Sequence, residues 1–286
     1  MPNAYETIEV HPLSTHVGAE IRGVDLGADL SERTVAEIKH AFHESGMVVF
    51  HDQNITPEQH IAFARHIGDI NVNRFFASLE GYPEIAEVLK EPHHEKNIGG
   101  GWHTDHTYDQ APALGSALLA REVPSTGGDT LFTHMAAVFD SLSEGLKDML
   151  RTMKARHSSR HVFGASRYAT EEQQKEWEGR MKNADAALQD AVHPVVITHP
   201  ESGREVLYVN GGFTLGFEGW TDEESKPLLD YLYSVAVRPE FTCRLAWRKG
   251  SLALWDNRST WHYALNDYPG ERRYMHRITI EGSELH

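Results

Sequence analysis

The sequence predicts a mainly β protein with peripheral helices and a double-sheet jelly-roll core. Short apolar segments bounded by turn residues recur along the chain, two amphipathic helical segments lie near the N-terminus, and strand patterns dominate after residue 193. Several short antiparallel strands with helices at the periphery are typical of double-sheet jelly rolls. At 286 residues the chain is long for one domain but within the range of β barrels and sandwiches, so we expect a single domain over residues 1–286.

Two helices are predicted before residue 70. Ser31 is a candidate N-cap for a helix that ends near Gly46. Thr56-Pro57-Glu58-Gln59 starts the second helix with a capping Thr, a Pro at the first helical position and a Gln two residues later. A third helix is expected from the capping pair Thr221 and Glu224 to about Val235, and helical periodicity also marks residues 135–153.

Strands are predicted wherever short apolar or alternating runs lie between turn residues. The expected strands cover residues 47–50, 85–91, 115–122, 129–132, 195–198, 205–209, 241–247, 251–256 and 272–281. Glu201-Ser202-Gly203 and Arg248-Lys249-Gly250 each separate two of these strands, which predicts two hairpins.

Two segments lack the pattern of a packed core, and we expect both to be lids. Residues 70–101 end in Gly99-Gly100-Gly101, which we interpret as a mobile loop near a functional site. Residues 159–192 are rich in charge with scattered aromatic residues. That composition fits a helical excursion over an active site and fits a solvated insertion equally well.

Composition restricts the classes of function. The 27 Lys and Arg residues and 42 Asp and Glu residues give a net charge of −15, which disfavours a binder of nucleic acid or of an anionic membrane. No apolar run approaches the ~18–20 residues of a membrane-spanning helix, and no signal peptide is visible. Cys243 is the only cysteine, which fits a cytoplasmic protein. We also expect a homo-oligomer, either a dimer or a tetramer.

Trp102-His103-Thr104-Asp105 is the strongest candidate for a metal-binding motif. In an extended segment His103 and Asp105 would point to the same side, roughly 6–7 Å apart, so that a cation could lie between them. His262, just past the strand at 251–256, is a candidate third ligand. His106 is a weaker alternative because the neighbour of Asp105 in an extended segment faces away.

Two arginines on the last predicted strand indicate an anion site. Arg273 and Arg277 share one face of that strand, roughly 13 Å apart along it. Two guanidinium groups on an inward face are costly unless they meet anions.

These residues resemble the TauD/TfdA family of iron(II)- and 2-oxoglutarate-dependent dioxygenases. The resemblance covers nearly the whole chain and is most specific at residues 102–105, 127–130 and 255–277. It implies a double-stranded β-helix core, with His103, Asp105 and His262 as Fe(II) ligands and catalytic centre. In such a site 2-oxoglutarate occupies two of the three open metal positions and O2 the third.

The resemblance also implies how the substrates bind. Thr130 and Arg273 match the pair that binds the distal carboxylate of 2-oxoglutarate, and Arg277 matches an arginine that meets an anionic substrate head. Phe213 matches a pocket aromatic residue. Asn73 takes the place of a histidine in the taurine-cleaving members and is a candidate substrate-binding residue, while Gly99 takes the place of an asparagine there.

The expected reaction is hydroxylation of a small anionic organic substrate, with fragmentation of the product beside a heteroatom. Because the chain departs from the taurine enzymes, a sulfonate, an alkyl sulfate or an aryloxyalkanoate or other carboxylate with a larger or more apolar body is expected. The resemblance also implies hydroxylation rather than halogenation, because halogenating relatives lack a carboxylate at the position of Asp105.

Two other classes of protein stay open at the level of the sequence. One is a non-catalytic cupin-like protein that binds a metal or an anion, against which the presence of Arg273 and Thr130 argues. The other is a zinc hydrolase built on the same three ligands.

Overall fold

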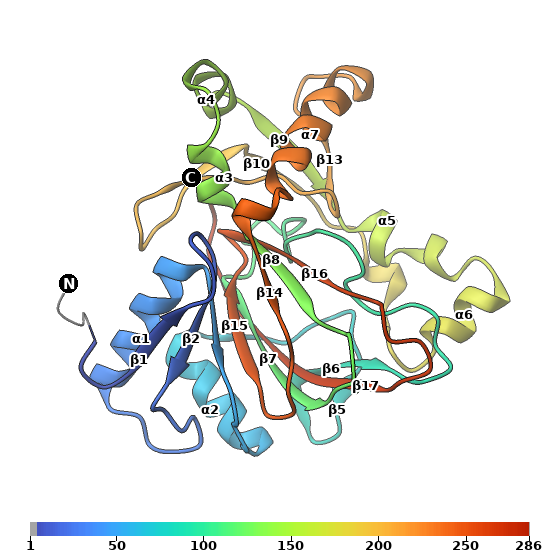
Figure 1. The fold of residues 1–286 in the computed structure, drawn as a ribbon. Coiled ribbons are helices and arrows are strands. Elements are labelled where there is room, and N and C mark those ends of the chain that lie inside the picture. Colours follow the sequence, from blue (N-terminus) through green and yellow to red (C-terminus); the bar gives the residue numbers. More distant parts are fainter. Residues whose placement is uncertain (1–4, 286) are drawn as a thin grey trace.

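A broad mixed sheet forms the centre of the computed structural model, which describes residues 5–285 (Figure 1). Its strand order is β1-β2-β3-β15-β7-β17-β6-β5, and β4 pairs with β17. The strands are β1 (Glu9–Pro12), β2 (Ala19–Arg22), β3 (Met47–Phe50), β4 (Ile70–Asn71), β5 (Ser78–Leu79), β6 (Tyr82–Lys90), β7 (Gly115–Glu122), β15 (Leu252–Asp256) and β17 (Arg273–Ile280). The pairing of β2 with β3 is parallel, and the other pairs are antiparallel.

A second sheet packs against the first. It consists of β14 (Thr242–Leu245), β8 (Thr130–His134) and β16 (Thr260–Ala264), with β8 in the middle. One buried apolar cluster contains residues of both sheets, among them Phe132 of β8, Leu118 of β7 and Met275 of β17. Residues of β8 and β17 therefore face a common interior. His262 of β16 faces it too, with its ring 6.2 Å from the ring of Phe132.

Two smaller sheets lie beside this core. One has the order β10-β9-β13, with β9 (Lys154–Ser158), β10 (Asp190–Pro194) and β13 (Thr214–Phe217), and the other pairs β11 (Val196–Thr198) with β12 (Glu205–Leu207).

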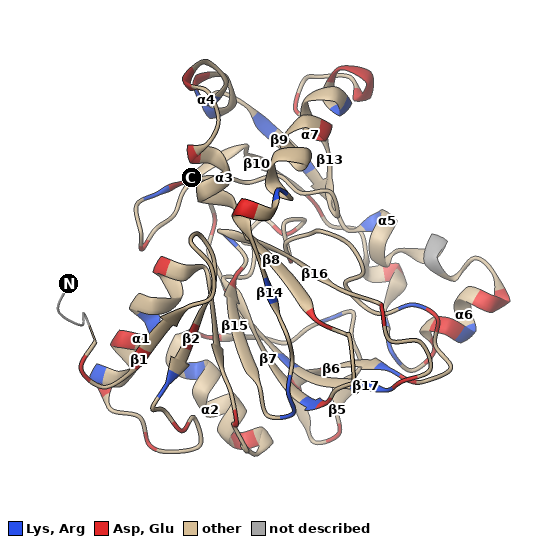
Figure 2. Ribbon diagram, in the orientation of Figure 1, with Lys and Arg blue, Asp and Glu red and all other residues tan. Residues whose placement is uncertain are grey.

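The helices lie at the periphery of the sheets. They are α1 (Glu32–Ser45), α2 (Pro57–Ile67), α3 (Met135–Asp140), α4 (Glu144–Arg151), α5 (Arg160–Phe163), α6 (Glu171–Trp177) and α7 (Asp222–Ala236), with short 3-10 helices η1 (Ala165–Tyr168), η2 (Ala184–Ala186) and η3 (Pro239–Phe241). Figure 2 shows acidic residues on the outlying helices α6 and α7. Among residues 5–285, no helix has the length and apolar character needed to cross a bilayer.

The predicted helix starts are confirmed. Ser31 caps α1 by accepting a hydrogen bond from the backbone N–H of Thr34, and Gly46 ends the helix in the left-handed conformation at φ 69°. Thr56 and Thr221 each form a complete capping box, with Gln59 and Glu224 as their partners. These features depend on residues three positions apart, so the sequence alone reveals them.

One prediction of secondary structure is wrong. The segments around 241–247 and 251–256 are strands but do not form a hairpin, because β14 pairs with β8 whereas β15 pairs with β3 and β7. With β3 and β7 on its two edges, β15 has no edge left for β14. The helical periodicity of residues 135–153 is confirmed, and this segment forms two helices, α3 and α4.

The caps provide a test of the local structure. Ser31 and Ser143 are both exposed N-cap serines, but only Ser31 accepts a side-chain hydrogen bond from its helix. Ser31→Ala is therefore expected to lower the free energy of unfolding by about 1 kcal/mol, whereas the matched control Ser143→Ala should change it by less than about 0.5 kcal/mol. Chemical denaturation measures both values, and equal losses would contradict the assignment of the caps.

Candidate active site

His103, Asp105 and His262 lie together, as the sequence predicts. The Nε2 atom of His103 is 3.6 Å from Oδ1 of Asp105, and Nε2 of His262 is 3.7 Å from Oδ2 of Asp105. One potential ligand atom from each residue lies within 4.8 Å of the others. Two imidazole nitrogens and one carboxylate oxygen at such distances can hold one divalent cation on one face and leave its other positions open.

The backbone brings these residues together from distant parts of the chain. The N–H of His103 donates to the carbonyl of His262 at 3.1 Å, and the N–H of His262 donates back at 2.8 Å. Between the two motif ligands, the hydroxyl of Thr104 donates to the carbonyl of Asn257 at 2.6 Å. His106 then adopts a left-handed conformation at φ 62°. It pairs with Asp109 and lies outside the triad, as the sequence predicts.

The surroundings of the triad favour the protonation states that a metal requires. Nδ1 of His103 lies 2.8 Å from the carbonyl of Gly101, so its N–H donates there and Nε2 is left as the ligand atom. Burial, and then the neighbouring His103, lowers the pKa of His262 well below its ordinary value. Burial raises the pKa of Asp105, but Arg277 and the two histidines outweigh burial and hold this pKa well below the ordinary value. Neutral His262 and ionised Asp105 can bind a cation without losing a proton.

Both predicted arginines reach the same interior. Nη2 of Arg277 donates to Oδ2 of Asp105 at 2.9 Å and to the hydroxyl of Ser116 at 3.0 Å. Arg273 is 4% exposed, and its Nε and Nη2 atoms find no hydrogen-bond partner within residues 5–285. Its guanidinium lies over the ring of Trp247, whose indole N–H donates to the hydroxyl of Thr130 at 2.9 Å. A buried, unpaired guanidinium is costly, so this position favours an anionic ligand.

A cavity of about 350 Å³ joins the triad to the arginines. Its polar lining comes from the triad, Thr130, Arg273 and Arg277, and its backbone lining from the glycines at 99–101 and 211–212. The remaining walls are apolar: Phe76, Val88, Ile98, Trp102, Leu118, Val162, Phe163, Trp177, Met181, Phe213, Trp255 and Ala264.

The two predicted lid segments contact each other beside this cavity. The N–H of Ala77 donates to the carbonyl of Arg180, and the N–H of Lys182 donates to the carbonyl of Phe75 at 2.8 Å. The carboxylate of Glu176 accepts from the N–H of Lys96 at 2.9 Å. Residues of both segments line the cavity, so they form one joined wall of it.

Of the two further substrate-site residues predicted from the sequence, Phe213 lines the cavity and Asn73 does not. Phe213 is buried, lines the cavity, and has its ring 6.2 Å from the ring of His103. Asn73 does not belong to the cavity lining, and its side-chain oxygen accepts hydrogen bonds from the N–H groups of Phe75 and Phe76. Contact between Asn73 and a substrate therefore stays a prediction.

Several residues in the cavity wall or in contact with it carry no signal in the sequence. Ser116 is a small buried residue inside a strand, and its contact with Arg277 depends on the register of β7 with β17. Val162, Phe163 and Met181 belong to the charged segment 159–192, in which apolar residues have no clear periodicity.

Comparisons with known proteins agree with this geometry. The family described as "Taurine catabolism dioxygenase TauD, TfdA family" matches residues 9–279. The chain is 32% identical to an alkylsulfatase of Acinetobacter baylyi, over 98% of this chain and 87% of the relative. It is 33% identical to the (S)-phenoxypropionate/alpha-ketoglutarate-dioxygenase of Sphingobium herbicidovorans, over 96% and 95% of the two chains.

Solved structures show the same likeness. A putative alpha-ketoglutarate-dependent taurine dioxygenase from Burkholderia xenovorans superposes with a TM-score of 0.82 at 34% identity, covering 96% of this chain and 93% of that one. AAD-2 in complex with Mn(II) and N-oxalylglycine superposes with a TM-score of 0.77 at 29% identity, covering 98% and 99%. The fold and the site are those of an α-ketoglutarate-dependent (2-oxoglutarate-dependent) dioxygenase, an oxidoreductase. The chain belongs to the TauD/TfdA family.

Metal binding at the triad can be tested without turnover. At free Mn(II) 100 times its Kd, linkage should raise the free energy of unfolding of the metal-free protein by about 2.7 kcal/mol. Asp105→Ala should abolish this rise because it removes the only carboxylate of the triad. Asp140→Ala is a suitable control, since that carboxylate pairs with Arg204 at the surface. A melting temperature of the Asp105 variant that still rises with Mn(II) would remove Asp105 from the ligand set.

Proposed function

We propose that the chain is an Fe(II)-dependent dioxygenase that uses 2-oxoglutarate to hydroxylate a small organic anion with an apolar body. The observation that carries the proposal is the buried guanidinium of Arg273, which has unpaired nitrogen atoms and lines the same cavity as the triad. A dicarboxylate with one end at the metal and the other at Arg273 supplies the missing negative charge.

Thr130 completes this anion site. Its hydroxyl oxygen accepts the indole N–H of Trp247, which orients the hydroxyl and leaves its own O–H to donate to a carboxylate. Burial lowers the pKa of Arg273, yet an arginine side chain stays protonated in proteins. A cation and a neutral donor therefore converge on the distal carboxylate of 2-oxoglutarate.

The donor set of the triad supports iron as the metal. Two histidines and one carboxylate with open positions are the ligand set of non-haem Fe(II) oxygenases. Iron held there would supply oxidation by O2, with one oxygen atom entering succinate as 2-oxoglutarate loses CO2 and the other hydroxylating a substrate C–H bond. The residues of the chain orient the two organic substrates, and the apolar walls exclude water around the reacting bond.

We assign the anionic head of the substrate to Arg277. Nη2 of this side chain already bonds to Asp105 and Ser116, while its buried Nε finds no partner within the described part of the chain. An anionic head bound at Arg277 would lie beside the triad. The substrate carbon next to that head would then be the carbon nearest the metal, and so the one that is oxidised. Hydroxylation there, next to a heteroatom, lets the product fragment.

The remaining lining favours an apolar body on this anion. Phe163, Met181 and Phe213 supply apolar side chains, and Gly99 supplies only backbone. The names of the relatives fit this description, because they include an alkylsulfatase, a sulfonate dioxygenase and a phenoxypropionate dioxygenase. A sulfonate, an alkyl sulfate or an aryloxyalkanoate or other carboxylate is the substrate class that we propose.

We also infer that the main sheet and the sheet β14-β8-β16 are the two halves of a double-stranded β-helix. The shared apolar cluster between them and the antiparallel pairing of β8 with β14 and β16 support this interpretation.

The 2-oxoglutarate site is tested by Arg273→Met. Anaerobic addition of Fe(II) and 2-oxoglutarate to the parent should give a weak visible metal-to-ligand charge-transfer band. The variant should need roughly 100-fold more 2-oxoglutarate, because hydrogen bonds to a charged group contribute about 1.5–3 kcal/mol each. Its melting temperature without ligands should not fall, since the change removes an unpaired buried cation.

Arg272→Met is the matched control for this experiment. Arg272 is the preceding residue, but it is half-exposed and pairs with Glu91 and Glu122 outside the cavity. The affinity of the Arg272→Met variant for 2-oxoglutarate should equal that of the parent. Absence of the band in intact parent protein at saturating 2-oxoglutarate would overturn the cofactor assignment.

The substrate class is tested by a panel of sulfonates, alkyl sulfates, phosphonates and aryloxyalkanoates. Substrate-dependent formation of succinate identifies the substrates that turn over, and the best of them should combine an anionic head with an apolar body. With that substrate, Arg277→Ala should mainly raise KM while 2-oxoglutarate affinity stays close to that of the parent. A selective loss of 2-oxoglutarate affinity would mean that Arg273 and Arg277 have the opposite roles.

A further inference from the structure

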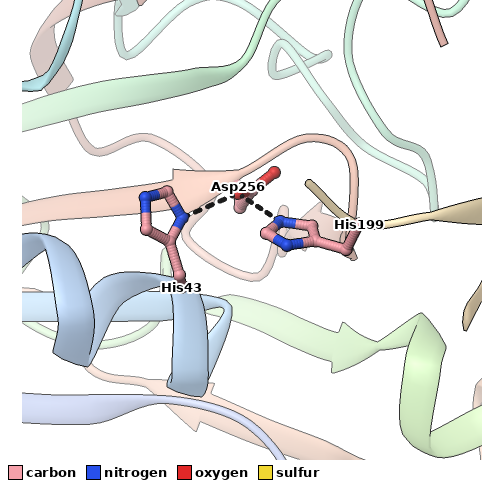
Figure 3. A group of neighbouring side chains, drawn as sticks. All are labelled: His43, His199 and Asp256. Atoms are coloured by element: carbon pink, nitrogen blue, oxygen red, sulfur yellow. Dashed lines mark hydrogen bonds and ion pairs between the residues drawn. The ribbon is translucent and has the colours of Figure 1, made fainter. Parts of the chain in front are cut away.

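A second group of two histidines and one aspartate lies outside the cavity (Figure 3). His43 belongs to α1, His199 follows β11, and Asp256 ends β15. Oδ2 of Asp256 is 3.0 Å from Nε2 of His199 and 3.5 Å from Nδ1 of His43. The potential ligand atoms lie within 4.8 Å of one another, so the group has the composition and spacing of the metal triad.

A guanidinium occupies the place that a cation would take in this group. Arg258 donates from Nε to Oδ1 of Asp256 at 2.9 Å and from Nη2 to Oδ2 at 2.6 Å, and its backbone N–H also donates to Oδ1. Nη2 of Arg258 is also 2.9 Å from the carboxylate of Glu201. Both oxygens of Asp256 are thus engaged by a permanent cation.

His199 is arranged as a donor to this carboxylate, whereas Nδ1 of His43 approaches it at 3.5 Å. Nδ1 of His199 accepts the N–H of Ser202 at 3.2 Å, so the proton of the ring lies on Nε2 and is donated to Asp256. Burial raises the pKa of Asp256, but Arg258 and the two histidines outweigh burial and keep this pKa well below its ordinary value. Both ring nitrogens of His199 are therefore engaged, and no lone pair of this residue is left for a metal.

The network holds a buried turn that is connected to the metal triad through Thr104 and through the chain to His262. Residues 256–260 are all buried, and the hydroxyl of Thr260 donates back to the carbonyl of Asp256 at 2.7 Å. The carbonyl of Asn257 in this turn accepts the hydroxyl of Thr104, which lies between two of the ligands. The third ligand, His262, follows the turn on β16 and pairs by its backbone with His103.

We propose that the ion pair of Asp256 with Arg258 is a positioning device for the metal ligands. It fixes the turn at 256–260, and the turn holds Thr104 through the carbonyl of Asn257. The geometry of His103, Asp105 and His262 thereby depends on a network that contains no metal of its own. This inference rests on the metal site of the proposed function.

The test compares Mn(II) affinity, measured on metal-free protein by electron paramagnetic resonance, with stability measured without metal. Thr104→Val removes the hydroxyl but keeps the shape of the side chain. It should raise the Kd for Mn(II) about tenfold, which is the lower end of the range for groups that orient metal ligands from outside the ligand set. Arg258→Lys keeps the charge but loses the bidentate geometry, and it should raise the Kd by a similar factor. Because both substitutions act through the carbonyl of Asn257, the Kd for Mn(II) of the double variant should rise by less than the product of the two single rises.

Thr133→Val is the matched control. Its hydroxyl is also buried and donates to a backbone carbonyl, that of Ala236, at 2.8 Å, but it has no bond to the turn or to a ligand. It should lose stability comparable to that lost by Thr104→Val and leave the Kd for Mn(II) unchanged.

Three outcomes would overturn the proposal in distinct ways. A Thr104 variant that loses stability but keeps parental Mn(II) affinity would show a purely structural role. Binding of two Mn(II) ions per chain, one of them lost in His199→Ala, would show that the second group is itself a metal site. A parent that binds no Mn(II) would remove the metal site of the proposed function, and the positioning role with it, whereas either of the first two results leaves the proposed function intact.

Discussion

Two backbone hydrogen bonds between His103 and His262 hold the candidate metal ligands together. They connect a loop in the first half of the chain to β16 near its end, and the ligand side chains leave the backbone at that junction. The junction depends in turn on β8, which pairs with β16 and carries Thr130 at its first residue. The metal ligands and the proposed 2-oxoglutarate site are therefore set by one sheet, and a change of register in it would displace both.

Local charge rather than net charge determines whether the cavity attracts anions. The chain carries a net charge of −15, with acidic residues on its outlying helices (Figure 2). Inside, Arg273 and Arg277 share one face of β17, and Asp105 pairs with only one of them. A dicarboxylate and an anionic substrate can thus be attracted by a protein that is acidic overall, because interactions inside an apolar cavity are screened far less than those at the surface.

The sequence predicted the features that depend on short spacing or on strand alternation. His103 and Asp105 are two residues apart, Arg273 and Arg277 share a strand face, and the capping pairs are three residues apart. It predicted the hairpin of β11 with β12 but not the partners of β14 and β15, whose strand patterns say nothing of the strands they pair with. It also missed the group of His43, His199 and Asp256, whose members come from three distant segments.

The two groups of histidine and aspartate show why composition alone does not identify a metal site. Arg277 bonds to Oδ2 of Asp105, while Oδ1 of the same carboxylate lies 3.6 Å from the ligand nitrogen of His103. Arg258 instead bonds to both oxygens of Asp256. A carboxylate that shares one oxygen with an arginine keeps the other for a metal, but one that is chelated by the guanidinium has no oxygen left. The position of one arginine therefore distinguishes a carboxylate with one oxygen not bonded to the guanidinium from a carboxylate with both oxygens bonded to it.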